Sequence, residues 1–290
     1  MKPALFLTLL ALTLPAAAAD YACQNAYGSL TKEIAGFKVV IAPATDDAHK
    51  AQCRAAITSA DDKNVFEGYS PQFNLEPISG RDVNADDKPD VVFSGKAAKP
   101  ACCYSYWIVS LGEQPGLVRE FTTTAQLNFE DKLGDGKVEI WGRDNAFDGF
   151  DRFPSTESPF PLVFLRMKGA NIYNVSQIFW PEYEREIAQA KAALPRSATF
   201  DLTREEQDKK GGGNPEAHDP KDEELMRDKA LVLEIALNYL YGGKGQQAWQ
   251  TISDMWPPLD RQRVRQQILM TRMKGLLSEI NRQPKPAPAQ

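Results

Sequence analysis

Short apolar runs separated by turn-forming residues occupy the middle of the chain, from residue 72 to about residue 176. Gly, Pro, Asn and Asp lie between these runs, which have the length of ordinary strands. Short strands at regular spacing with turn signals between them are typical of antiparallel β-meanders. The expected strands are Phe73–Ile78, Val91–Ser94, Tyr104–Leu111, Leu117–Thr123, Ala125–Phe129, Val138–Trp141, Leu162–Met167 and Ile172–Ser176.

Two further elements are expected before this region. Residues 33–41 form an apolar run that ends before Pro43 and predict a strand. Thr45 followed by Asp46 and Asp47 has the pattern of a helix N-cap with an acidic first turn. A short, Ala-rich helix is therefore expected to continue to about Thr58.

Apolar positions at helical spacing return towards the C-terminal end. Pro181 stands in the first turn of one expected helix, and Gly242-Gly243 and Pro257-Pro258 separate later ones. Between them, residues 195–222 are charged, contain three consecutive glycines and predict a linker. Helices are expected over residues 181–194, 224–241, 246–255 and 259–280, and the tail 284–290 is Pro-rich.

Residues 1–19 have the pattern of a secretory signal peptide. Lys2 supplies the charge, residues 4–14 the apolar segment and residues 15–19 the small residues before cleavage. This apolar segment is too short to span a bilayer, and no later segment approaches the required length. The product is therefore expected to be periplasmic or secreted, and soluble after cleavage.

The four cysteines in an exported chain indicate disulfides. Three pairings are possible, and the sequence alone does not choose among them. The favoured arrangement joins Cys23 to Cys53, with Cys102 and Cys103 either bridged to each other or left as a mobile pair. Metal-type and redox-type cysteine spacings are both absent from the sequence.

Charge and motif content narrow the possible functions. The net charge of −5 gives no electrostatic reason to expect nucleic-acid binding. The sequence has two histidines and no phosphate loop, dinucleotide fingerprint or zinc-protease motif. A hydrolase that uses two carboxylates stays open, because it needs only two acids at the right distance. The expected protein is nevertheless not an enzyme.

One stretch has the spacing of a cation site. Oxygen-bearing side chains stand at alternate positions of residues 82–90, immediately before an apolar run. Ca²⁺ takes roughly six to eight oxygen ligands and tolerates loose loop geometry. An EF-hand is excluded because Phe93 stands at its twelfth position. The expected ligands are the side chains of Asp82, Asn84, Asp86 and Asp90 and the backbone carbonyl of Lys88.

This stretch resembles the metal loop of the FG-GAP (VCBS-type) β-propeller repeat, whose pattern is Asp-x-Asp/Asn-x-Asp-Gly-x-x-Asp followed by a strand. Asp87 stands where that repeat has Gly, and Asp tolerates the left-handed conformation needed there. A second copy at residues 131–140 has this Gly but carries Leu133 at a ligand position, so metal binding is not expected in it. The resemblance covers residues 65–180 and implies blade-like hairpins with a structural calcium ion.

The expected fold class is therefore α+β, with an N-terminal antiparallel β-rich domain of propeller-blade-like hairpins and a small C-terminal helical region. The β-rich domain would occupy residues 20–194, with short helices, and a helical hairpin plus a third helix would occupy residues 223–283. Residues 231–258 also resemble a single tetratricopeptide repeat, although a stable array needs about three.

The loop over residues 142–161 is long, acidic and rich in phenylalanine. Phe147, Phe150 and Phe153 either anchor the loop to the sheet, which is the favoured interpretation, or bind a glycan. The leading hypothesis is an exported, non-enzymatic binding or scaffold protein, and the alternative is a carbohydrate-binding or carbohydrate-active protein that uses this loop. A third hypothesis is a scaffold for envelope assembly that binds a protein partner through residues 231–280.

Overall fold

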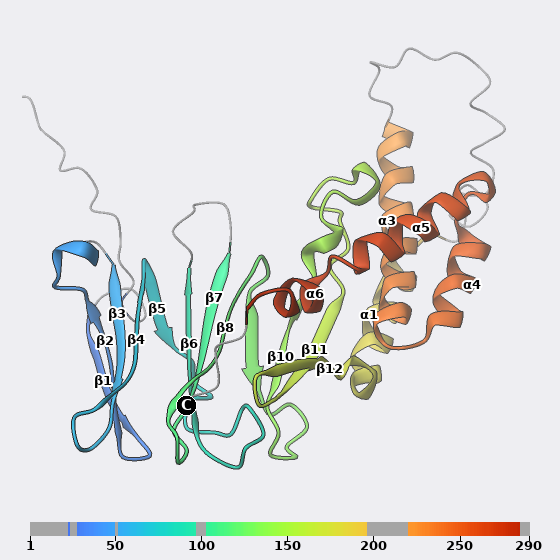
Figure 1. Cartoon of the computed structure of the whole chain (residues 1–290). Helices are drawn as coiled ribbons and strands as arrows, with labels where there is room; N and C mark the ends of the chain where they lie inside the picture. The colour runs from blue at the N-terminus through green and yellow to red at the C-terminus, as the bar shows by residue number, and fades with distance from the viewer. Residues whose placement is uncertain (1–22, 24–27, 50–51, 97–102, 196–219, 285–290) are drawn as a thin grey trace, which may run out of the picture.

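The computed structural model describes residues 23, 28–49, 52–96, 103–195 and 220–284. These residues form three antiparallel sheets of four strands each, connected in chain order (Figure 1). The first sheet comprises β1 (Leu30–Ile34), β2 (Phe37–Pro43), β3 (Cys53–Thr58) and β4 (Asn64–Ser70). The second comprises β5 (Gln72–Leu75), β6 (Asp90–Lys96), β7 (Tyr104–Ser110) and β8 (Gly116–Thr123). The third comprises β9 (Leu127–Glu130), β10 (Glu139–Arg143), β11 (Leu162–Lys168) and β12 (Asn171–Asn174).

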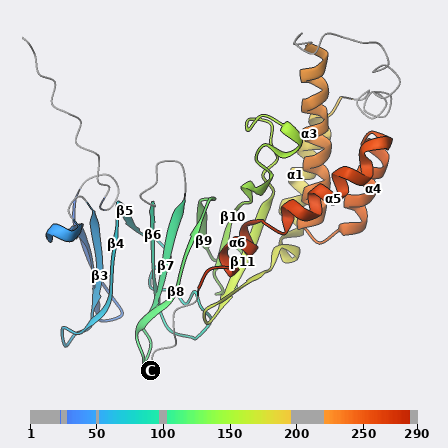
Figure 2. The ribbon, with the colours of Figure 1, turned by 45° about the horizontal axis from the view of Figure 1, so that its top comes forward.

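The sheets lie in a row, with the second sheet between the first and the third (Figure 1 and Figure 2). Successive side chains of a strand point to opposite faces. Val91 and Phe93 of β6 accordingly join the core shared with the first sheet, whereas Val92 joins the core shared with the third. A strand covered on both faces is buried at nearly every position, which is what β6 and β7 display.

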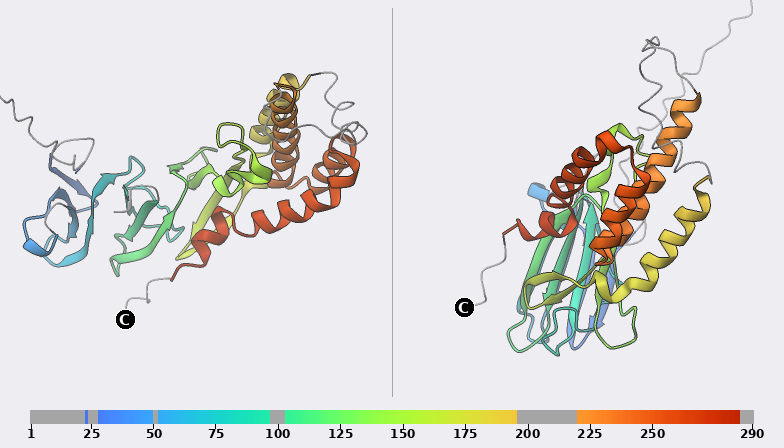
Figure 3. Two further views of the ribbon diagram at one scale, coloured as in Figure 1. Left: turned by 90° about the horizontal axis from the view of Figure 1, so that it is seen from above. Right: turned by 90° about the vertical axis from the view of Figure 1, so that its right-hand side faces the viewer.

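Helices cover the far end of the row. They are α1 (Trp180–Ala193), α3 (Pro220–Tyr241), α4 (Gly245–Met255), α5 (Arg261–Arg272) and α6 (Leu276–Asn281). Short 3-10 turns are η1 (Asp47–His49), η2 (Asn145–Phe147), η3 (Phe150–Arg152), η4 (Ser176–Phe179) and η5 (Pro258–Asp260). From above, α5 and α6 run back from the other helices along the sheets (Figure 3).

One hydrophobic core joins the second and third sheets to these helices. It extends from Val92 and Phe164 to Trp256, Ile268 and Ile280. The expected linker therefore separates the two regions along the chain but not in space; its residues 196–219 lie outside the described part. Together the sheets and helices confirm the expected α+β class, with a β-rich N-terminal part and a helical C-terminal part.

The predicted helix over residues 45–58 is wrong. The chain forms the short turn η1 and then β3, in which Cys53, Ala55 and Ile57 are buried at alternate positions. A period of two places these residues on one face, against the second sheet. The alanine content concealed this alternation, since alanine has the highest helix propensity but also fits a closely packed sheet face.

Two other expected elements are divided. The predicted strand over residues 33–41 is a hairpin, because Ala35 and Gly36 adopt positive φ angles of 52° and 82° and form its turn. The predicted helix over residues 259–280 ends at Arg272 and resumes at Leu276. No helix in the described ranges is long and apolar enough to cross a membrane.

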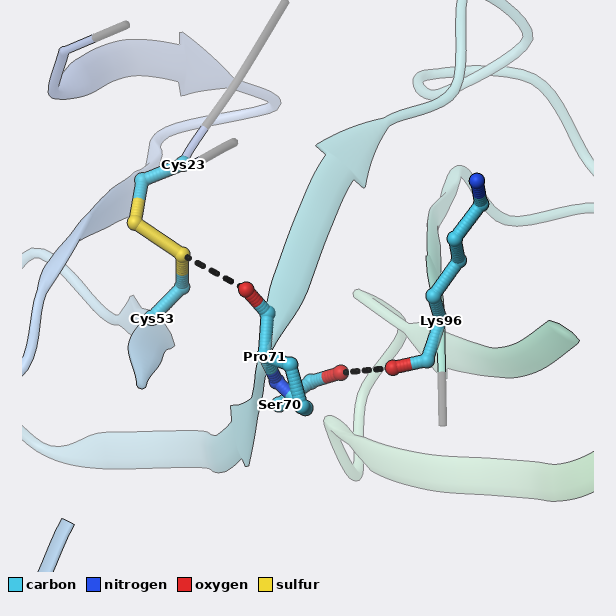
Figure 4. Close-up of a disulfide and its surroundings, with 5 residues drawn as sticks. All are labelled: Cys23, Cys53, Ser70, Pro71 and Lys96. Carbon is cyan, nitrogen blue, oxygen red and sulfur yellow. Dashed lines mark hydrogen bonds between the residues drawn. A yellow bond between two sulfur atoms is a disulfide. The ribbon is translucent and has the colours of Figure 1, made fainter. Parts of the chain in front are cut away.

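The disulfide lies where the first and second sheets meet. Cys23 is joined to Cys53, the favoured pairing, with Cα atoms 5.5 Å apart (Figure 4). The Cys53 sulfur lies 3.8 Å from the carbonyl oxygen of Pro71, in the connection between β4 and β5. Cys103 is also disulfide-bonded, and Cys102 lies outside the described residues. The first bridge thus ties the N-terminal segment to β3, beside the junction of the two sheets.

Candidate functional site

The loop over residues 82–90 connects β5 to β6 in the middle sheet. Its backbone turns sharply at Ala85 and Asp87, which have φ angles of 59° and 63°. Asp87 thus adopts the left-handed conformation that the sequence pattern requires at that position. Asp and Asn tolerate this conformation better than most residues, so the loop forms there without glycine.

Three of the five predicted ligands converge in this loop. The Asn84 side-chain nitrogen donates to Asp86 Oδ2 at 3.1 Å and to Asp90 Oδ1 at 3.2 Å. The other oxygen of Asp90 accepts the backbone N–H groups of Val83 at 2.7 Å and Asn84 at 3.0 Å. The amide of Asn84 therefore bridges two carboxylates at the centre of the loop.

Asp82 and Lys88 occupy the periphery of this cluster. The two carboxylate oxygens of Asp82 accept the backbone N–H groups of Asp86 and Asp87. The N–H of Lys88 donates to Asp86 Oδ1 at 2.9 Å. Among the described residues no three His, Cys, Asp or Glu side chains form a metal cluster, and the convergent set here is two carboxylates and one amide. Oxygen donors of this kind suit a hard cation.

The electrostatic environment of Asp90 is acidic. Asp90 is fully buried, and burial raises the pKa of its carboxyl to about 7, with Asp86 and Asp82 adding to the rise and hydrogen bonds from Val83 and Asn84 opposing it. Asn84 is 1% exposed, and its side-chain oxygen has no hydrogen-bond partner. A buried oxygen without a partner is costly, and a bound cation would supply the missing interaction.

The loop over residues 131–139 connects β9 to β10 and repeats the same backbone pattern. Gly136 N–H donates to Asp131, as Asp87 N–H donates to Asp82. Lys137 N–H likewise donates to Asp135 at 3.0 Å. The closing acid is the fully buried Glu139, which accepts the N–H of Lys132 at 2.9 Å. The two loops therefore correspond residue by residue in adjacent sheets.

The second loop differs because an arginine side chain from the neighbouring strand β11 pairs with its acids. Arg166 of β11 donates from Nε to Glu139 at 2.5 Å and from Nη2 to Asp135 at 3.0 Å. Leu133, at the position of Asn84, is exposed. No local sequence pattern indicates this arrangement, because Arg166 lies 27 residues from Glu139. Only the register of β10 and β11 brings them together.

The phenylalanines of the 142–161 loop are buried. Phe147, Phe150 and Phe153 all belong to the main core, and the Phe147 ring lies 6.3 Å from that of Tyr241 in α3. They therefore anchor the loop, as the favoured interpretation predicts. The alternative interpretation, in which these rings stack on a glycan, is corrected by their burial. Rings that are at most 4% exposed do not present a face to a sugar.

A buried carboxylate in this loop was missed by the sequence analysis. Asp144 accepts hydrogen bonds from the Tyr241 hydroxyl at 2.8 Å, from Leu276 N–H at 3.1 Å and from Ala146 N–H at 3.1 Å. It thus joins the loop, α3 and the start of α6. Gly275 precedes α6 and approaches so closely that a Cβ there would lie 2.3 Å from the Asp144 carboxylate.

Of the two histidines, His49 lies in the described part of the chain, in η1 and not in the 82–90 loop. His49 stacks on Tyr69 in the first sheet at 3.6 Å and bonds to Asp46, and His218 lies outside the described residues.

Comparison with known protein families, with curated proteins and with solved structures found no match to this chain.

Proposed function

We propose that this chain is an exported, non-enzymatic binding or scaffold protein whose row of sheets is stabilised by Ca²⁺ bound in the 82–90 loop, as in the FG-GAP-type repeats that the loop resembles. The observation that carries the proposal is the buried Asn84 amide, whose nitrogen bridges the Asp86 and Asp90 carboxylates while its oxygen has no hydrogen-bond partner. The signal-like N-terminus and the disulfide support a periplasmic or secreted location.

Rotation of one amide group would prepare the loop for the ion. The oxygen and nitrogen of an Asn amide are nearly equal in shape. Turning the Asn84 amide by about half a turn would place Oδ1 beside Asp86 and Asp90, which only a cation between them would favour. These three residues would hold the ion, and Asp82 and the Lys88 carbonyl would complete the shell.

The position of the loop supports a structural role for the ion. The carbonyl of Asn84 accepts the N–H of Gly169, in the turn between β11 and β12, at 2.7 Å. Arg81 pairs with Asp131 of the second loop at 3.1 Å. An ion in the 82–90 loop would therefore fix the junction between the second and third sheets, without any chemical step.

Calcium is expected to raise the thermal midpoint of the mature protein. Extracellular modules bind Ca²⁺ with Kd of roughly 10⁻⁴–10⁻³ M, so about 10 mM Ca²⁺ would shift the midpoint by roughly 3–8 °C through preferential binding to the folded state. The Asp86→Ala variant should lose this shift, because it removes a central ligand. Differential scanning calorimetry in EDTA and in Ca²⁺ measures both effects.

The matched control is Asp131→Ala in the second loop. Asp131 occupies the position of Asp82 in the second loop, whose acids pair with Arg166 of β11. This variant should therefore keep the full Ca²⁺ shift, even if its own thermal midpoint is lower than that of the unmodified protein. An equal midpoint of the unmodified protein in EDTA and in Ca²⁺ would contradict the proposal and leave residues 82–90 as a hydrogen-bonded turn.

A binding role for the helical end rests on an exposed apolar face of α5. Leu269, Met270 and Met273 are 47%, 57% and 67% exposed and are neighbours at helical spacing. Arg265, whose guanidinium stacks over Trp249, and Lys274 precede and follow them in the sequence. Met-rich surfaces adapt to helical partners, and the flanking cations favour an acidic one. The proposed partner is therefore an acidic, apolar helix of an envelope protein.

To test this surface, a photocrosslinking amino acid is placed at position 270 of the full chain, which is expressed in cells with an envelope. One crosslinked adduct is expected, and its protein partner should carry an acidic apolar helix. The Met273→Asp substitution should abolish this adduct. The control places the crosslinker at Lys38 on the exposed side of β2. Equal adducts at both positions, or none at position 270, would remove this part of the proposal.

A further inference from the structure

The two corresponding loops differ at the residue across the strand from the acid that closes each loop. In the second sheet, Asp90 of β6 pairs with Ser110 of β7. In the third sheet, Ile140 pairs with Leu165, so the next position along places Glu139 opposite Arg166. Ser110 and Arg166 thus occupy the same place relative to the two loops.

The side chains at this place satisfy the acids in different ways. The Arg166 guanidinium lies between Glu139 and Asp135, which correspond to Asp90 and Asp86. Ser110 is short and neutral and donates only its hydroxyl to Asp86 at 3.1 Å. One guanidinium bridges the two carboxylates and supplies one positive charge, whereas a hydroxyl supplies none.

We infer that this cross-strand residue decides which loop takes an ion: Arg166 serves as the built-in cation of the second loop, and Ser110 leaves the first loop dependent on an external one. The residue at the third loop position changes in parallel. Asn84 would offer its amide oxygen to an ion once the amide rotates, while the side chain of Leu133 has no oxygen and is exposed. The part concerning Ser110 rests on the proposed function; the part concerning Arg166 does not.

The first arm of the experiment fills the first loop. The Ser110→Arg variant of the full mature chain should bind no calcium in equilibrium dialysis, and its midpoint in EDTA should rise towards that of the calcium-loaded unmodified protein. Ser110→Gln has a long neutral side chain and is the matched control for size. It should also weaken binding but should not raise the midpoint. Equal midpoints in EDTA for the two variants would overturn the role of charge.

The second arm removes the arginine from the second loop. It uses the Asp86→Ala background, so that the first loop contributes no calcium binding. Arg166→Ser combined with Leu133→Asn should bind one calcium ion per chain and show a calcium-dependent midpoint. Arg166→Lys combined with Leu133→Asn keeps the charge, is expected to fold without calcium and should bind none. Absence of calcium binding to the folded serine variant would overturn the inference.

The two arms separate this inference from the proposed function. If the unmodified protein binds no calcium but the Arg166→Ser, Leu133→Asn chain does, the proposed function fails and the role of Arg166 stands. If the serine variant does not fold even in millimolar calcium while the lysine variant does, calcium fails to replace the guanidinium and the inference is overturned. Circular dichroism in the dialysis buffer distinguishes these cases.

Discussion

The Phe147→Ala variant is expected to lose about 4 kcal/mol of unfolding free energy, because truncating a fully buried phenylalanine removes apolar contacts and leaves a cavity. Phe147 is 0% exposed and lies between Phe150 and Tyr241, with ring centroids 5.5 and 6.3 Å away. It therefore connects the 142–161 loop to α3. Urea denaturation followed by fluorescence and circular dichroism measures the loss.

A partly exposed aromatic residue provides the matched control. Tyr173 of β12 is 44% exposed, and Tyr173→Ala should change stability by less than about 1 kcal/mol. Comparable losses in the two variants would mean that the 142–161 loop does not pack as described. A Phe147→Ala protein of unchanged stability that loses binding on a glycan array would instead restore the carbohydrate hypothesis.

The strands of the second and third sheets were predictable because their apolar runs are separated by strong turn residues. The first sheet was predicted only in part: the expected strand over residues 33–41 overlaps β2, whereas the alanine-rich β3 was expected to be a helix and β4 (Asn64–Ser70) was not predicted. Its identity as a strand depends on burial against the second sheet. Such tertiary context overrides local propensity more strongly in sheets than in helices.

The candidate site was also predictable only in part. The convergence of Asn84, Asp86 and Asp90 followed from their spacing, because alternate residues of a tight loop turn inward. Ser110 and Arg166 could not be found in this way, since each reaches its acid through the pairing of neighbouring strands. Local spacing therefore identified the converging side chains, whereas strand register identifies the residue that sets the charge beside them.

A contact between β8 and the end of α6 likewise could not be predicted from local sequence spacing. Arg119 of β8 is fully buried, and its guanidinium donates to the carbonyl oxygens of Ile280 at 2.8 Å, Pro284 at 3.3 Å and Gln283 at 3.5 Å. These carbonyls lie at the end of α6, where a helix leaves its last acceptors without partners. The positive charge also suits that end of the helix dipole.

Arg119→Met is therefore expected to lower the unfolding free energy by about 3 kcal/mol, because it removes the charged donor from the buried Ile280 carbonyl and from two partly buried ones while keeping much of the side-chain volume. The loss should be local: hydrogen exchange should rise over residues 276–284 more than in β6. The matched control is Arg282→Met, an exposed arginine on the same segment, which should cost less than about 0.5 kcal/mol. Uniform exchange across the whole chain in Arg119→Met would contradict local detachment and would mean that α6 and the sheets unfold as one unit.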